Sequence, residues 1–159
     1  MSTLNKIGGH LIVTVAILLM FHGCKTNPEC SDPVTYEIPF QGFGTNVEGD
    51  NFTLQNVDEN QTNVALVIGN SADFQKYISC INFPEIDFNE SFVLAGRTKR
   101  PACAYMKDQT LSLKCDQLQY NIEIEDMLCQ KPTDVFYIVI VSKEYFKYPV
   151  KFSITLSNN

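Results

Sequence analysis

Six cysteines are the residues of this chain whose side chains could carry covalent chemistry, at positions 24, 30, 80, 103, 115 and 129. None forms a CxxC motif, so the spacing gives no support to a zinc cluster or a thioredoxin-like redox site. In an exported chain, cysteines are expected to form structural disulfides, which persist in oxidising compartments. Disulfide formation is therefore the chemistry that most of these residues predict.

Cys24 differs from the other cysteines because it directly follows an export signal. Lys6 precedes the eleven-residue apolar run Leu11–Phe21, whereas roughly 20 apolar residues are needed to span a bilayer. The run ends in Gly23-Cys24, which resembles a bacterial lipobox, where the cysteine is lipidated and becomes the new N-terminus. We expect residues 1–23 to be a lipoprotein signal peptide and residues 24–33 a lipidated tether. The alternative is an ordinary signal peptide followed by a structural Cys24.

Lipidation of Cys24 would leave five cysteines, one of them unpaired or paired between molecules. Two strands are expected to join near Asp116, which lies midway between Cys103 and Cys129. A hairpin turning there would bring these two cysteines opposite each other. Cys80, at the end of a predicted helix, is the competing partner for Cys129. Either pairing places Cys129 in a disulfide.

Histidine is missing from the chain after the export signal, because His10 and His22 both lie within residues 1–23. This excludes Ser-His-Asp and Cys-His nucleophile pairs and His-ligated metals from the mature chain. Catalysis would have to use carboxylates, Lys, Tyr or an unassisted Ser. We therefore expect a protein that is not an enzyme and that needs neither a metal nor another cofactor.

The charge of the mature chain is acidic. Lys6 is the one Lys or Arg of residues 1–23, which contain no acid, so 18 acidic residues face 11 of the 12 basic ones, a net charge of −7. This balance argues against nucleic acid as a partner. The length of residues 34–159 fits a single domain.

Hydrophobic periodicity predicts a mainly β, α+β fold: an antiparallel sheet or sandwich of about seven strands with one short helix near 72–80. Ser71 is expected to cap this helix, and Pro39 to break the first strand or hold it at an edge. The expected strands are 34–43, 64–68, 91–95, 103–114, 118–126, 135–141 and 150–156, with a further short strand at 52–54.

Three of these strands have predicted places in the sheet. Val64–Ile68 is apolar on both faces, which is typical of an interior strand. Val135–Val141 is the most apolar run of the mature chain and is expected at the centre of the sheet. Val150–Leu156 alternates apolar and polar residues and is expected to return as the hairpin partner of Val135–Val141.

The order of these segments is similar to that of a known family. An aliphatic strand ending near Ile68 runs into a helix bearing Phe74, Asp87-Phe88 opens the next strand, and Tyr148-Pro149 precedes the last one. This resembles small β-rich bacterial lipoproteins of the type that includes the C-terminal domain of the B-type component of a protease complex, over residues 64–156. A Gly-rich turn of that family is replaced here by residues 97–100. The resemblance implies an accessory or binding role without catalysis.

Two predicted loops carry candidate partner-binding residues, because rigid β scaffolds usually carry recognition on their loops. Arg97, Lys99 and Arg100 form the basic cluster of the chain. Tyr145 and Tyr148 belong to an aromatic segment that could stack on a partner, or could fold back and cover the open end of the sheet.

Together these observations predict a membrane-anchored lipoprotein of the cell envelope, held by lipid in the outer membrane. It would act as a non-catalytic binding or accessory protein for a protein partner there, such as a protease or another envelope complex. The alternative is a secreted, non-lipidated module that binds carbohydrate or peptide.

Overall fold

The part of the chain that the structure describes is built mainly from β-strands. The structure is a computed structural model and describes residues 35–42, 52–80 and 83–157. The strands are β1 (Tyr36–Glu37), β2 (Phe40–Gly42), β3 (Phe52–Leu54), β4 (Asn63–Ile68), β5 (Ile78–Cys80), β6 (Ser91–Arg100), β7 (Ala104–Lys114), β8 (Gln117–Asp126), β9 (Thr133–Ser142) and β10 (Val150–Ser157). The helices are α1 (Ser71–Tyr77) and the 3-10 turn η1 (Lys143–Tyr145). This confirms the predicted mainly β, α+β class.

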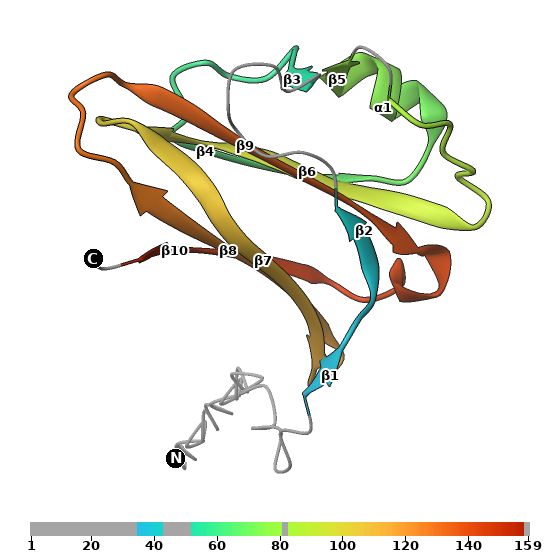
Figure 1. The fold of residues 1–159 in the computed structure, drawn as a ribbon. Coiled ribbons are helices and arrows are strands. Elements are labelled where there is room, and N and C mark those ends of the chain that lie inside the picture. The colour runs from blue at the N-terminus through green and yellow to red at the C-terminus, as the bar shows by residue number, and fades with distance from the viewer. Residues whose placement is uncertain (1–34, 43–51, 81–82, 158–159) are drawn as a thin grey trace, which may run out of the picture. The chain divides into compact units, whose positions relative to one another are not determined.

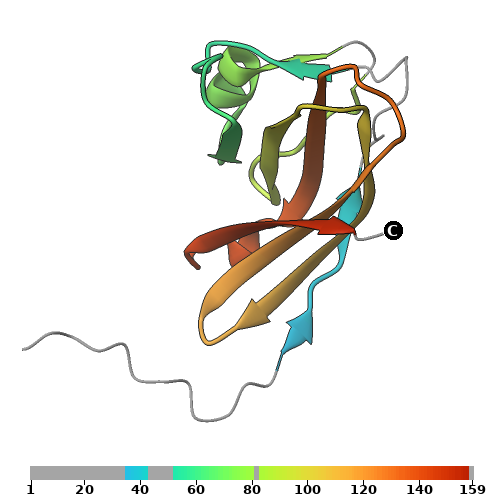
Figure 2. The same cartoon turned by 90° about the vertical axis from the view of Figure 1, so that its left-hand side faces the viewer.

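The strands form two four-stranded sheets and one small two-stranded sheet. Sheet A has the order β1-β7-β8-β10, sheet B the order β2-β9-β6-β4, and β3 pairs with β5. The pairs are antiparallel except for β8 and β10, which are parallel. Sheets A and B face each other, and β3, β5 and α1 lie on the far side of sheet B (Figure 1 and Figure 2).

Two hydrophobic cores follow from this three-layer arrangement. The larger one fills the space between sheets A and B and contains Leu118, Ile122 and Ile124 of β8, as the alternation of that strand predicts. The smaller one lies between sheet B and the α1 layer and contains Phe52, Ile78 and Ile138. Sheet B is therefore buried on both faces, which explains why β6 and β9 are apolar almost throughout.

Buried tyrosines connect the two sheets. The Tyr120 and Tyr137 rings meet edge to face with centroids 5.9 Å apart. Burial raises the pKa of both phenols, and each hydroxyl has a partner: Tyr120 donates to Gln109 Oε1 at 2.6 Å and Tyr137 to the Val64 carbonyl at 3.0 Å. A Cβ on Gly96 would lie 2.4 Å from the Tyr137 ring, so only glycine lets this ring cross β6 to reach β4.

Helix α1 is shorter than predicted. Asn70, not Ser71, is the N-cap, and its side-chain oxygen accepts a hydrogen bond from the Asp73 backbone N–H at 2.8 Å. The helix ends at Tyr77 because Ile78 is extended and pairs with Leu54 of β3. The periodicity that suggested a helix as far as residue 80 instead places Ile78 in the smaller core from a strand.

Three strand predictions are corrected by the topology. β4 lies at the edge of sheet B and not in its interior, and Val67 on it is exposed. β6 continues through Arg100, where a loop was expected after residue 95. β10 pairs with β8 in sheet A and is not the hairpin partner of β9. The predicted break at Pro39 and the central position of β9 are confirmed.

Candidate functional site

The predicted basic loop is part of a strand. Arg97 lies in β6 with only 6% of its side chain exposed. Its guanidinium donates to the carbonyls of Asp58 and Gln61 at 3.2 and 3.1 Å and lies 3.6 Å from the Asp134 carboxylate. Arg97 therefore fastens the segment before β4 to sheet B, and its prediction as a loop residue is wrong.

Lys99 and Arg100 are half-buried near the end of the same strand. Arg100 forms a bidentate pair with Asp126 at the end of β8, with distances of 2.9 and 2.5 Å. This hydrogen bonding raises the pKa of Arg100 and lowers that of Asp126. The pair links sheet B to sheet A at one end of the sandwich. The three basic residues thus do not form one exposed basic patch.

The aromatic segment folds back onto the sandwich. Tyr145 and Tyr148 are partly buried and pack against the larger core. Phe146 is more exposed, yet its ring contacts Phe92 with centroids 5.3 Å apart. Of the two interpretations of this segment, the structure favours coverage of the open end of the sheets.

The cysteines are consistent with an exported chain. Cys103 and Cys129 form a disulfide, as the midpoint of the hairpin predicted. Cys80 is not its partner; it lies in β5 with a free thiol. A disulfide indicates a location outside the reducing cytoplasm. Cys24, the predicted lipidation site, lies outside the described residues.

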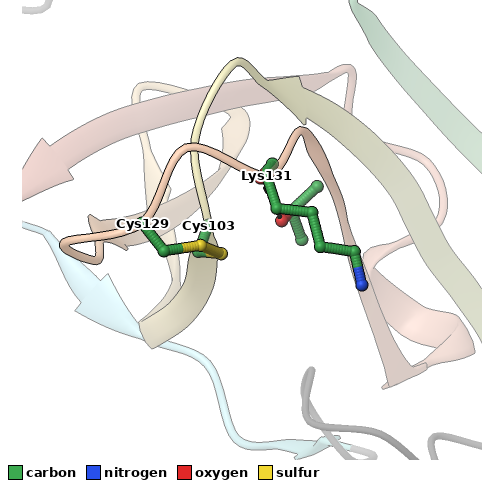
Figure 3. The surroundings of a disulfide bond; sticks show 4 residues. Cys103, Cys129 and Lys131 are labelled. Atoms are coloured by element: carbon green, nitrogen blue, oxygen red, sulfur yellow. Dashed lines mark hydrogen bonds between the residues drawn. A yellow bond between two sulfur atoms is a disulfide. The ribbon is translucent and has the colours of Figure 1, made fainter.

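The disulfide fixes a short apolar loop between β8 and β9 that the sequence did not suggest as a site. Figure 3 shows Cys103, just before β7, joined to Cys129, with Lys131 farther along the same loop and extending away from the bridge. Backbone hydrogen bonds reinforce the link: Met127 N–H donates to Cys103 O at 2.6 Å, and Cys103 N–H donates to Cys129 O at 3.3 Å. The loop is therefore held at three points.

Leu128 is at the apex of this loop. The Cys129 N–H donates to Met127 O at 2.7 Å, which closes a γ-turn around Leu128. Leu128 is fully exposed and Met127 is 52% exposed. The Met127–Leu128 tip, as we call these two residues, thus presents two apolar side chains on a rigid support. The one sequence signal for it is a pair of large apolar residues next to a disulfide cysteine.

Carboxylates near the same end of sheet A have basic partners. Lys107 lies 3.5 Å from Glu123 and 3.1 Å from Glu125, and Asp126 is paired with Arg100. Within residues 35–42, 52–80 and 83–157, no group of three His, Cys, Asp or Glu side chains is placed to hold a metal ion. Over the same ranges, no helix is long and apolar enough to span a membrane.

Comparison with known proteins gives no relative from which a site could be transferred. No protein-family model, curated protein or solved structure matches the chain. The geometry of the described residues is therefore the basis for a functional proposal.

Proposed function

We propose that this protein is a membrane-anchored lipoprotein of the cell envelope that binds another protein without catalysis, through the Met127–Leu128 tip. The observation that carries the proposal is the full exposure of Leu128 on a turn held by a disulfide. An apolar side chain that is already fixed in its exposed position loses little conformational entropy when a partner buries it. The tip therefore has the properties of a preorganised binding anchor.

The tip and the anchor would lie at opposite ends of sheet A. Tyr36 of β1 pairs with Leu113 near the end of β7, whereas Cys103 directly precedes its start. At about 3.4 Å per residue, the eleven residues of β7 separate these ends by about 35 Å. Figure 1 shows β1 and the loop between β8 and β9 at opposite ends of the sheet. A lipid on the N-terminal side would therefore favour a tip directed away from the membrane, toward a protein.

The chemistry of the tip describes the surface that would receive it. Met127 and Leu128 require an apolar cleft, and the exposed ammonium of Lys131 on the same loop favours an acidic group at the rim of that cleft. The neighbouring Asp126 does not oppose this arrangement, because Arg100 neutralises it. We infer a partner with an acidic-rimmed apolar cleft.

Cysteine pairing links this proposal to lipidation. Cys115 is disulfide-bonded, Cys103 pairs with Cys129, and Cys80 is free, so only Cys24 and Cys30 can be candidates for its partner. A cysteine carrying lipid on its sulfur cannot form a disulfide, so the lipoprotein proposal requires a Cys30–Cys115 bridge. Such a bridge would shorten the free tether to the six residues before Cys30, about 20 Å at full extension.

Metabolic labelling and peptide mapping together test the anchor. Wild-type protein should take up labelled palmitate and Cys24→Ala should not, because lipid chains on this residue provide the attachment. Non-reducing peptide mapping should find Cys30 joined to Cys115. A Cys24–Cys115 peptide, or equal labelling of the two proteins, would favour the secreted, non-lipidated module instead.

Site-specific photo-crosslinking in intact envelopes tests the tip. A benzophenone side chain at position 128 should give a discrete cross-linked protein, and the same group at Val67 should not. Val67 is the matched control because it is also an exposed aliphatic residue, 46% exposed on β4. Leu128→Asp should abolish co-purification of the cross-linked protein. If Val67 yields the same product, or if Leu128→Asp retains it, the tip is not the binding anchor.

A further inference from the structure

A pocket on the opposite side of sheet B from the larger core is separate from the tip. It has a volume of about 430 Å³ and lies between helix α1 and the segment that leads from β5 to β6. Phe74 of α1 and the segment residues Phe83 and Phe88 line it, together with Ile86, Glu85, Cys80, Pro84, Ser71 and Gln75. Its size suits a small organic ligand or a head group.

The wall of this pocket is aromatic. Phe74 lies between the other two rings, with centroids 5.4 Å from Phe83 and 5.9 Å from Phe88. The rings are inclined to each other by 48° and 55°, so they form a tilted wall and not a flat stack. The π-face of a phenylalanine carries partial negative charge and attracts a cation placed over it.

The ionisable groups near the pocket are mostly acidic. Glu85 lines it and is exposed, and Asp73 and Asp87 lie on the two segments that form it. Lys76, the nearest lysine in sequence, has its ammonium 4.7 Å from the centroid of its neighbour Tyr77. Lys143 lies 4.4 Å from the Phe146 ring centroid and donates to the Gly69 carbonyl. Aromatic faces and a carboxylate thus meet at the pocket, while these two lysines have partners elsewhere.

We propose that this pocket binds a quaternary ammonium group, carried by a free small molecule or by a lipid head group. Phe74, Phe83 and Phe88 supply the aromatic faces, and Glu85 supplies the counter-charge. A methylated ammonium fits better than a primary one because it needs no hydrogen-bond acceptors from the ring wall and is removed from water at lower cost. Cys80 contributes only its apolar surface to this site.

Titration of the full-length protein with choline, followed by NMR, tests the proposal. Choline should bind, and its uncharged isostere 3,3-dimethyl-1-butanol should bind about ten-fold more weakly, because it lacks the cation–π attraction. Equal affinity for the two would show a merely apolar cavity and would overturn the proposal. Vesicles of phosphatidylcholine, compared with vesicles of phosphatidylglycerol, identify the source: selective retention indicates a lipid head group, and binding of free choline alone indicates a small molecule.

Two variants locate the bound cation. Phe88→Leu keeps an apolar side chain but removes one aromatic face, and Glu85→Gln removes the carboxylate. Each should weaken choline binding several-fold with little change in the melting temperature, since both residues are at least partly exposed. Glu59→Gln, an exposed acid outside the pocket lining, is the matched control and should bind as the wild type does. Wild-type affinity in Phe88→Leu and Glu85→Gln would place choline elsewhere and refute the site.

Discussion

The Met127–Leu128 tip and the connection between β9 and β10 both carry large apolar side chains, yet they place them differently. Leu128 is fully exposed, whereas Tyr145 and Tyr148 pack against the larger core. The tip is held outward by a disulfide and by backbone hydrogen bonds to Cys103. The aromatic segment is free to turn inward and covers the end of the sandwich. An apolar loop therefore stays exposed where covalent and backbone restraints support it.

The largest expected effect tests whether the aromatic segment is structural. Replacing both Tyr145 and Tyr148 with Ala should lower the free energy of unfolding by about 4 kcal/mol, because two partly buried rings leave the core. Chemical denaturation measures this loss. Tyr36→Ala is the control, since Tyr36 is 61% exposed and its loss should cost less than about 1 kcal/mol. Equal effects in the two proteins would contradict the comparison.

Removal of the disulfide tests the support of the tip. Cys103→Ala with Cys129→Ala opens a loop with a sequence separation of 26 residues, and the chain-entropy model predicts a loss of about 3.5 kcal/mol. Amide exchange at Met127 should accelerate more than exchange in the middle of β8, because the Met127 N–H bonds to Cys103. Cys80→Ala, which breaks no bridge, should leave this exchange unchanged. Unaltered Met127 exchange in the double variant would show that the turn holds without the disulfide.

A third test extends the comparison to the basic residues. Arg97→Ala should lower the free energy of unfolding by about 2 kcal/mol, because the carbonyls of Asp58 and Gln61 lose a charged donor. Lys99→Ala, two residues along the same strand, should change it by about 0.5 kcal/mol or less. Thermal unfolding of the two variants measures the difference. Similar melting temperatures would mean that Arg97 is not a structural link.

The smallest expected effect concerns pH at the base of the tip. The Arg100 guanidinium lowers the pKa of Asp126 in the folded state, so the pair stabilises the fold above the ordinary pKa of an aspartate. This stabilisation is lost as the pH falls below about 4 and through the lowered pKa. Because Asp126 is 41% exposed, the contribution is less than about 1 kcal/mol. The difference in melting temperature between wild type and Asp126→Asn should shrink between pH 5 and about pH 2; a constant difference would exclude the pair as its source.

Much of the local structure could be predicted from the sequence. The period-two alternation of residues 118–124 determined which face of β8 is buried. The apolar run 135–141 belongs to a strand buried on both faces, and Pro39 separates β1 from β2. The pairing of Cys103 with Cys129 followed from the turn near Asp116, where residues 115 and 116 adopt positive φ. These features depend on side-chain periodicity and backbone chemistry close along the chain.

The arrangement of those elements was decided only by tertiary structure. Alternation in β10 shows which side chains are buried but not which strand is its neighbour, and packing of Phe152 against Tyr120 accompanies its place in sheet A. Arg97 was expected in a loop because it is charged, but β6 buries it where distant carbonyls accept its hydrogen bonds. Leu128 is an ordinary residue in the sequence. Its exposure depends on Cys103, 25 positions away, because the bond partners that hold a loop outward come from another part of the fold.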